Sequence, residues 1–247
     1  MATTVNKNLS DRLSFLKTVS LFAQLNENDL TTLARQFQRR EYQSGEIIFR
    51  QGDNSRRLYV IASGKVRIFK ISPAGNETSI NIFSACDIVG EFATIDNQPR
   101  SATAKAIGRC VTLEIVSDTF TQFMREMPDL AMGVAQTLAG KVRWTANYAE
   151  TVAQYDAAGR LLHIILLYNE QMGEEEIPNK RYVLDLALNQ TDLASLIGAR
   201  REWVNRLLRD WKKRGLIEHS GSQIIILDLP AVINERDSRI EANQAGF

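Results

Sequence analysis

The sequence predicts an α+β protein in three parts: a roll of short β-strands in residues 1–127, one long helix in 128–155 and a winged helix-turn-helix in 156–247. Three observations lead to this prediction. Short β-rich runs are separated by glycines in the first half, a heptad pattern of apolar residues follows, and the last quarter has the pattern of helix, glycine, helix and hairpin. With 247 residues, 44% of them hydrophobic and 24% charged, the chain is long enough for two globular domains.

The chain carries no sign of export or membrane insertion. Its first residues, MATTVNKNLSDR, lack an apolar core, and no later stretch approaches about 18 uncharged apolar residues. We therefore expect a cytoplasmic protein with no membrane partner. The two cysteines, Cys86 and Cys110, cannot form a disulfide framework, and their apolar neighbours predict small buried thiols.

The first predicted elements are one short helix and a series of strands. Residues 21–37 form an amphipathic pattern that Asn26 can cap, with apolar positions at Leu30, Leu33, Ala34 and Phe37. From 41 to 116 the short runs EIIF, LYVI, KVRIFKI, TSINIF and VTLEI lie between glycines. Several alternate in period two, as half-buried strands do, for example Val66/Ile68 and Val111/Leu113/Ile115. This spacing indicates a small barrel or roll.

A long helix is predicted after Pro128. Its apolar seam, with spacings that alternate between three and four, is Ala135, Leu138, Val142, Thr145, Ala149 and Val152. A helix of about 26 residues spans roughly 39 Å, which is more than a small roll can cover. We therefore expect the seam to face a second copy of the chain in a homodimer. The alternative is that the helix lies along its own β-domain.

The C-terminal part has the pattern of a helix-turn-helix. Helical character resumes at 157–169, and an acidic, turn-like segment, GEEEIPNK, follows. Asn189 can then cap a helix that buries Leu193, Leu196 and Ile197. Gly198 supplies the turn to a second helix that buries Val204, Leu207, Leu208 and Trp211. Gly215 ends that helix, and the runs LIEH and QIIIL flank Ser220-Gly221-Ser222 as a hairpin, the wing.

Positive charge is concentrated on the second of these helices. Residues 199–214 hold seven Lys or Arg against Glu202 and Asp210. In a major groove, Arg201 and Arg206 can pair with guanine, and Glu202 can accept from cytosine. Glu202 and Arg206 can also form only an i,i+4 surface pair. The helix, glycine, helix and wing context favours DNA binding.

The segment GEFATIDNQPRSATAKA, residues 90–106, is typical of a nucleotide pocket. Gly90 follows a strand and lets backbone N–H groups approach an anion. Arg100 and Ser101 can supply a charged fork and a hydroxyl to a phosphate, and Glu91 can accept from a ribose hydroxyl. Arg100 can also simply offset Asp96.

These features together resemble the CRP/FNR superfamily, and within it the cAMP receptor type, over essentially the whole chain. The resemblance rests on the GE…RSA cassette, the roll, the seam helix and the reader IGARREWVNRLL. It implies a cyclic nucleotide-controlled transcription regulator with cAMP as effector, a palindromic DNA operator and RNA polymerase as partners. It also implies a pocket formed by Gly90, Glu91, Phe92, Arg100, Ser101, Thr145 and Ala146. The implied DNA-binding residues are Arg200, Arg201, Glu202, Trp203 and Arg206, with Asp156 at the hinge.

Two departures from the family pattern qualify these expectations. Ala146 replaces the usual hydroxyl residue beside Thr145, which leaves the choice of base open, so cyclic di-GMP, cGMP or no small effector are alternatives. The reader begins Arg200-Arg201-Glu202-Trp203 in place of Ser-Arg-Glu-Thr and loses a hydroxyl cap. A basic protein that binds nucleic acid through charge alone is a further alternative. An enzyme is not expected, because no nucleophile–base or metal-ligand spacing stands out.

Overall fold

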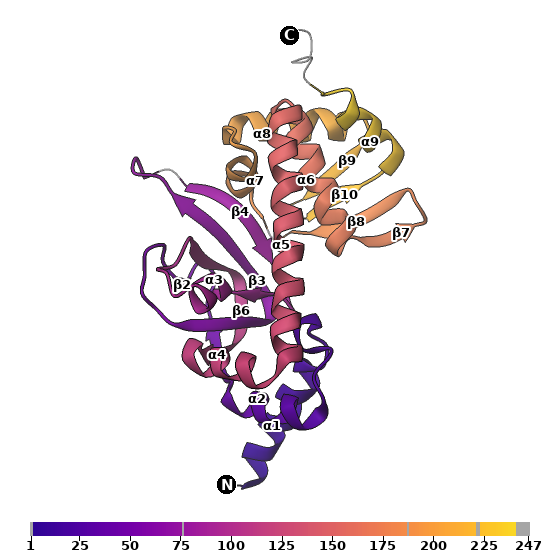
Figure 1. Ribbon diagram of the computed structural model, residues 1–247. Helices are drawn as coiled ribbons and strands as arrows, with labels where there is room; N and C mark the ends of the chain where they lie inside the picture. Colours follow the sequence, from indigo (N-terminus) through magenta and orange to yellow (C-terminus); the bar gives the residue numbers. More distant parts are fainter. Residues whose placement is uncertain (1, 76, 187, 221–222, 241–247) are drawn as a thin grey trace. The chain divides into compact units, whose positions relative to one another are not determined.

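The computed structural model describes residues 2–75, 77–186, 188–220 and 223–240, with side chains from residue 9 onward. The chain divides into two compact units, Met1–Val142 and Arg143–Phe247 (Figure 1). The long helix α5 (Pro128–Gln154) contributes to both units. Each unit has its own buried apolar residues, as expected of separately packed domains.

One antiparallel sheet forms the roll of the first unit. Its strands are β1 (Gln38–Tyr42), β2 (Ile47–Phe49), β3 (Arg57–Ile71), β4 (Glu77–Phe83), β5 (Ile88–Val89) and β6 (Thr103–Val116). The order is β1-β6-β3-β4, with β2 paired to β6 and β5 paired to β3. The long strands β3 and β6 therefore each pair with one short strand near one end and another near the other end. This arrangement confirms the predicted roll.

Two details of the strand prediction are wrong. The runs LYVI and KVRIFKI are one strand, β3, which continues past Gly64 with register shifts in its pairing to β6. The expected alternation also fails, because Arg67 between Val66 and Ile68 is buried. In β6, Thr112 and Glu114 are buried together with Leu113 and Ile115. These strands are covered on both faces, which removes the in/out pattern.

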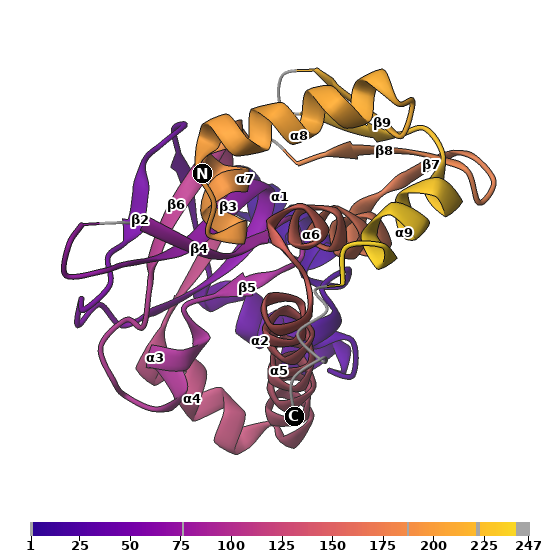
Figure 2. The same cartoon turned by 90° about the horizontal axis from the view of Figure 1, so that it is seen from above.

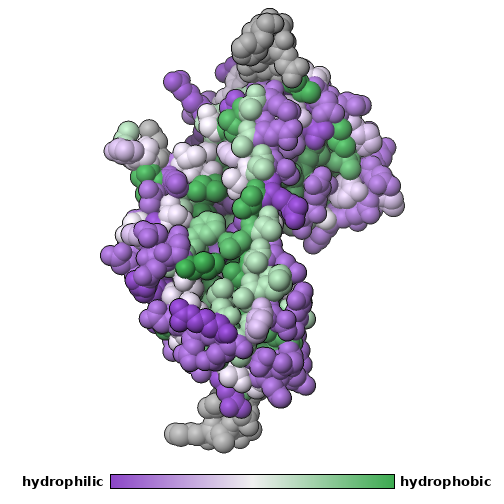
Figure 3. Space-filling view, viewed as in Figure 1, coloured by the Kyte–Doolittle hydropathy of each residue, from purple (hydrophilic) through white to green (hydrophobic). Residues whose placement is uncertain are grey.

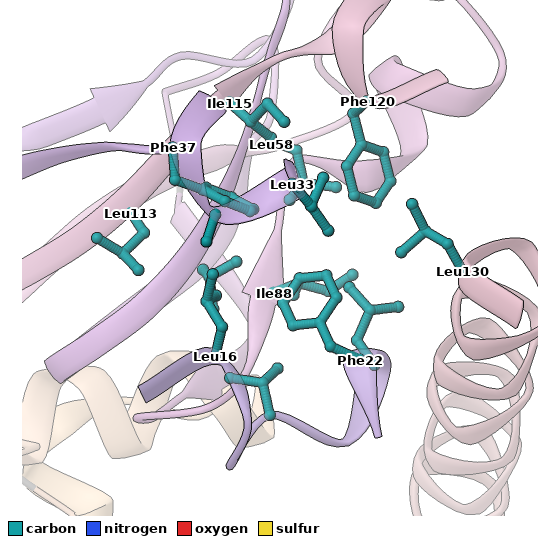
Figure 4. Close-up of a cluster of buried hydrophobic side chains, with 14 of the residues drawn as sticks. Leu16, Phe22, Leu33, Phe37, Leu58, Ile88, Leu113, Ile115, Phe120 and Leu130 are labelled. Carbon is teal, nitrogen blue, oxygen red and sulfur yellow. The ribbon is translucent and has the colours of Figure 1, made fainter. Parts of the chain in front are cut away.

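In the first unit, residues of the helices and of the roll share one buried apolar cluster (Figure 4). The helical elements of this unit are α1 (Ala2–Leu16), the 3-10 helix η1 (Ser20–Phe22), α2 (Glu27–Gln36), α3 (Glu91–Ile95), α4 (Ser117–Glu126) and the start of α5. Segment 21–37 is therefore not one helix as predicted. The Asn26 side chain accepts from Asp29 N–H and starts α2 separately from η1. The predicted apolar face of α2 is buried as expected.

The α5 helix begins at Pro128 and confirms the predicted long helix. Leu130 and Val134 pack in the core of the first unit. Of the seam residues, Leu138 is partly buried against that core, whereas the others are exposed: Ala135, Val142, Thr145, Ala149 and Val152. The helix thus buries one face in the roll and leaves most of the seam uncovered in a single chain.

The second unit is a winged helix-turn-helix. Its elements are α6 (Ala157–Met172), β7 (Glu174–Ile177), β8 (Arg181–Asp185), α7 (Gln190–Ile197), α8 (Arg201–Lys213), β9 (Ile217–Ser220), β10 (Gln223–Ile226) and α9 (Leu229–Asp237). The strands form one antiparallel sheet in the order β7-β8-β10-β9. In Figure 2, α8 lies on one side of strand β8 and the pair α6 and α9 lies on the other. All seven predicted apolar residues of α7 and α8 are buried.

Several local predictions for this unit are confirmed and one is wrong. Asn189 caps α7 in a capping box, and Gly198 adopts the left-handed conformation at its end with φ of 66°. The acidic segment GEEEIPNK is not only a turn, because its first residues form β7 and pair with β8. The predicted wing turn at Gly221 and Ser222, and most of the C-terminal tail, lie outside the described residues. In the first unit, Cys110 is buried as predicted, whereas Cys86 is only partly buried.

Candidate functional site

The predicted cassette lies where β5 meets α3. Gly90 adopts a φ of 84°, a conformation that side chains rarely tolerate. A Cβ at this position would lie 2.6 Å from Arg100 Nη1 and 3.1 Å from the Arg57 carbonyl oxygen. Two separate features therefore require glycine at position 90: the positive backbone angle and the close approach of the Arg100 side chain.

Arg100 is held on the inside of the roll and is 3% exposed. Its Nη1 donates to the Gly90 carbonyl at 2.7 Å, and its Nη2 donates to the Arg57 carbonyl at 2.5 Å. Its Nε donates to Ser55 Oγ at 3.1 Å. The guanidinium carbon also lies 4.3 Å from the centroid of the Phe49 ring. These contacts use three of the five guanidinium N–H groups.

The charge of Arg100 has no carboxylate in direct contact among the described residues. Burial lowers the pKa of this guanidinium, against smaller opposing effects of Tyr59 and of the Glu91 charge. Carbonyl dipoles, one hydroxyl and aromatic faces stabilise the cation, but they supply no net negative charge. A buried cation in this state gains most from an anion that accepts its remaining N–H groups.

Glu91, the first residue of α3, is also buried and is paired with a residue that the sequence did not indicate. Lys141 of α5 donates to Glu91 Oε1 at 2.7 Å and to the Ile88 carbonyl at 2.8 Å. The exposed fractions are 4% for the Glu91 side chain and 18% for that of Lys141. Lys141 holds one carboxylate oxygen, so a ligand hydroxyl can still donate to the other oxygen.

The described structure brings together only some of the predicted pocket residues. Gly90, Glu91 and Arg100 lie close together in the first unit, and Ser101 follows Arg100 as an exposed residue. Phe92 is 47% exposed, and its ring centroid lies 6.0 Å from Lys141 Nζ. Thr145 and Ala146 are exposed residues of α5 in the second unit. Sequence reasoning missed Ser55, Phe49 and Lys141, because their roles depend on contacts between distant segments.

The predicted reader residues lie on one exposed side of α8. Arg200 is its N-cap and makes no capping hydrogen bond with its side chain, so the missing hydroxyl cap is not replaced by this side chain. Arg201, Glu202 and Arg206 are exposed, whereas Val204 and Leu208 anchor the opposite face. Trp203 is 38% exposed, and the Arg206 guanidinium carbon lies 5.4 Å from its ring centroid. The arginines can therefore meet a surface outside the protein.

Two basic residues at the other end of α8 form ion pairs with acidic residues of the same unit. Arg214 pairs with Asp210 at 3.2 Å and forms a two-nitrogen contact with Glu235 of α9. Lys212 lies 3.7 Å from Glu218 of the wing. Acidic partners therefore offset the charges of Lys212 and Arg214, although both side chains remain partly exposed.

Two family models match the chain, and together they span most of it. The cyclic nucleotide-binding domain matches residues 39–127, and the Crp-like helix-turn-helix domain matches residues 159–234. A nucleotide-binding roll followed by this reader defines a transcription regulator controlled by a cyclic nucleotide. The chain belongs to the CRP/FNR superfamily of transcription regulators.

Named relatives agree with this assignment. A CRP-like cAMP-activated global transcriptional regulator of Mycobacterium tuberculosis is 29% identical over 213 residues, covering 86% of this chain and 94% of the relative. The Cyclic AMP receptor protein of Thermus thermophilus is 28% identical, with 82% and 89% covered. The first relative is named as a transcriptional regulator and the second as a receptor for cyclic AMP.

Solved structures show the same fold at lower identity. A variant of CooA from Carboxydothermus hydrogenoformans superposes with a TM-score of 0.73 at 20% identity, covering 91% of this chain and 99% of that one. The c-di-GMP responsive global regulator CLP of Xanthomonas campestris gives 0.68 at 21% identity, with 82% and 99% covered. Within the described part of the chain no helix has the length and apolarity to span a bilayer, and no three metal-binding side chains cluster.

Proposed function

We propose that this chain is a homodimeric DNA-binding regulator whose roll binds cAMP. The observation that supports this most is the buried Arg100 guanidinium, which has carbonyl and hydroxyl partners but no carboxylate contact within the described residues. A cyclic phosphate carries one negative charge and acceptor oxygens for the remaining N–H groups. Ser101 follows in the chain and adds a hydroxyl, while Glu91 accepts from the ribose.

The choice of cAMP rests on the names of the relatives and on the contacts proposed for the ribose and the base. Both relatives described above are named for cAMP. The pocket proposal places Gly90, Glu91 and Phe92 on the ribose side and Thr145 at the base. Ala146 offers no hydroxyl, so Thr145 is left as the principal polar contact to a purine edge. Cyclic di-GMP, the effector named for a structural neighbour, and cGMP are the competing ligands.

Calorimetric titration with cAMP, cGMP and cyclic di-GMP tests this proposal. We expect cAMP to bind the full chain most tightly. Arg100→Ala removes one partner of a buried charge-assisted contact and is expected to weaken cAMP binding by roughly tenfold to several thousandfold. Tighter binding of another cyclic nucleotide would reassign the effector, and unchanged affinity in a folded Arg100→Ala variant would reject the pocket.

The exposed seam of α5 supports the homodimer. Figure 3 shows apolar surface along this helix, and Val142 and Val152 are 68% and 43% exposed. Exposed apolar residues in a heptad pattern are typical of a helix that packs against a second copy. Sedimentation velocity of Val142→Glu/Ala149→Glu is expected to show monomers. The control variant Asn147→Glu changes a residue off the seam and should remain dimeric. If the double variant is still a dimer, the seam is not the dimer interface.

The reader helix α8 supports binding to double-stranded DNA. We propose Arg200 and Trp203 as phosphate or backbone contacts and Arg201, Glu202 and Arg206 as readers of base edges. A dimer with two such helices reads a near-palindromic operator with half-sites about 34–36 Å apart. The regulator acts in the cytoplasm and contacts RNA polymerase in this proposal. Selection of bound duplexes from a random pool tests it; recovery of sequences without any common half-site would reject base reading.

A further inference from the structure

One hydrogen bond in the second unit links the long helix to the helix-turn-helix. The Tyr148 hydroxyl of α5 donates to the Leu196 carbonyl at the end of α7, at 2.6 Å. Tyr148 is partly buried, and this burial raises the pKa of its hydroxyl, so the group is a protonated donor at neutral pH. The contact therefore persists over the physiological range.

The acceptor is one of the carbonyls that a helix cannot satisfy by itself. The last turn of a helix leaves its carbonyl oxygens without intrahelical partners. In α7 the Ala194 carbonyl accepts from Gly198 and Ala199, whereas the Leu196 carbonyl accepts from Tyr148. Leu196 itself is buried. Tyr148 thus holds the end of α7 directly before the Gly198 turn, which leads to Arg200, the N-cap of α8.

The donor is also tied to the part of α5 proposed to contact the nucleotide base. The ring of Tyr148 stacks on that of Trp144, with centroids 5.4 Å apart and planes inclined by 7°. Trp144 immediately precedes Thr145 in the chain. Along α5, the residues Trp144, Tyr148 and Thr151 are less exposed and form one helical face, whereas Thr145 and Ala149 lie exposed. A shift of the helix at Thr145 therefore moves Trp144 and Tyr148 with it.

We propose that Tyr148 is a positioning residue that couples the nucleotide pocket to the placement of the reader helix α8. This inference rests on the proposed function, because it takes Thr145 as a nucleotide contact and α8 as the DNA reader. A nucleotide that fixes the segment around Thr145 fixes Tyr148, and the hydrogen bond to Leu196 extends that ordering to the turn that orients α8. Coupling of this kind is a difference in DNA affinity between the ligated and free protein.

The experiment compares full-length Tyr148→Phe with the wild type. Phenylalanine keeps the ring and its stacking on Trp144 and removes only the donor. The quantity measured is the ratio of DNA affinities with and without saturating cAMP, on an operator selected with the wild type. A net hydrogen bond corresponds to a change of roughly three- to tenfold in an equilibrium, so we expect the ratio to fall by that factor. Affinity for cAMP in the absence of DNA should stay within about twofold.

The matched control is Tyr182→Phe. The Tyr182 hydroxyl donates at 2.5 Å to Glu175, which lies on the neighbouring strand β7 and away from α7, so its loss should leave the ratio unchanged. Hydrogen exchange at residues 198–201 gives a second readout: cAMP should increase protection there in the wild type but not in Tyr148→Phe. A purely structural role would lower both DNA affinities equally and keep the ratio.

The outcomes separate this inference from the function on which it rests. If the wild type shows nucleotide-dependent DNA binding and Tyr148→Phe keeps the full ratio, the inference is wrong and the proposed function stands. If no cyclic nucleotide tested changes the affinity of the wild type for DNA, both the inference and the proposed function are wrong. A reduced ratio in Tyr148→Phe with an unchanged ratio in Tyr182→Phe supports the coupling.

Discussion

Lys141 Nζ lies 2.7 Å from Glu91 Oε1, and this pair joins the start of α3 to the long helix α5 inside the first unit. The two charges are largely removed from water, and Lys141 also donates to the Ile88 carbonyl. The pair fixes the carboxylate that we propose for the ribose. It therefore places the nucleotide contact and the long helix in one hydrogen-bonded unit.

Removal of one member of this pair should be more harmful than removal of both. Lys141→Met leaves a buried carboxylate without its cation and is expected to lower the free energy of unfolding by about 3–5 kcal/mol. The double variant Lys141→Met/Glu91→Gln should recover much of that loss. Urea unfolding of the two single variants and the double variant measures the coupling.

An exposed ion pair provides the control. Lys17 and Glu27 lie 2.9 Å apart, with side chains 51% and 74% exposed. Lys17→Met should change the free energy of unfolding far less than Lys141→Met does, because water screens an exposed ion pair. Strict additivity of the Lys141 and Glu91 substitutions would show that the two side chains do not stabilise each other.

Gly90→Ala should abolish tight cyclic nucleotide binding without unfolding the roll. The added Cβ would lie 2.6 Å from Arg100 Nη1 and would displace the guanidinium. Gly75→Ala is the matched control, because Gly75 has nearly the same φ, 83° against 84°, and a Cβ added there would meet no atom within 4 Å. Both variants carry similar backbone strain, but only Gly90→Ala should lose at least about tenfold in affinity by calorimetry. Equal cyclic nucleotide affinities of the two variants would show that Arg100 does not contact the ligand.

Substitutions at the two ends of α8 should differ in kind. Arg201→Ala or Arg206→Ala is expected to cost about 1–3 kcal/mol on the preferred operator and to relax preference at one symmetric base pair. Lys213 is exposed near the end of α8, so Lys213→Ala should either have no effect or weaken all sequences alike, with a smaller salt slope. Binding-site selection at fixed salt measures this. Unaltered base preferences in both arginine variants would remove these arginines from the reading role.

The ion pairs of α9 should make the second unit sensitive to acid. Hydrogen bonds from Arg214, supported by Arg239, lower the pKa of Glu235 to about 2 despite its partial burial. The carboxylate is thus favoured in the folded state, so its stabilising effect is complete above the ordinary pKa of 4.5. This effect is lost as the pH falls from there towards 2.

Glu235→Gln isolates this effect. The variant lacks the titrating group, so its stability should decline less steeply than that of the wild type between pH 4.5 and 2. At pH 7 it should be less stable than the wild type by roughly 1–3 kcal/mol, because charge-assisted hydrogen bonds are lost. Denaturant unfolding across this pH range gives both quantities. Parallel stability curves would show that Glu235 carries no net ion-pair energy.

The helix-turn-helix was predictable because its signals are local. Asn189, Gly198 and the apolar spacing of α7 and α8 each determine structure within a few residues. Helix α1 carries such a signal too, since Leu9, Leu13 and Leu16 recur at helical spacing, but the predicted elements began only at residue 21.

The pocket was only half predictable. Gly90, Glu91 and Arg100 lie in one short motif, but their partners come from elsewhere. Lys141 lies fifty residues beyond Glu91, and Arg100 is held by Ser55 and by a backbone carbonyl that any residue could supply. Polar residues of β6 are buried together with its apolar residues because other segments of the chain cover both faces of the strand, so burial does not follow the alternation in the sequence. Contacts between distant segments leave no local trace in a single sequence.

The most direct test of the proposed function measures DNA binding as a function of cyclic nucleotide. Fluorescence anisotropy with a selected operator duplex, at fixed salt, is run with and without cAMP on the wild type and on Arg100→Ala. We predict that cAMP raises the affinity of the wild type for the operator by at least about fivefold, a coupling of the usual size for two linked sites. Arg100→Ala should bind with the unligated affinity in both conditions. Equal operator affinity of the wild type with and without cAMP would contradict a cAMP-controlled regulator.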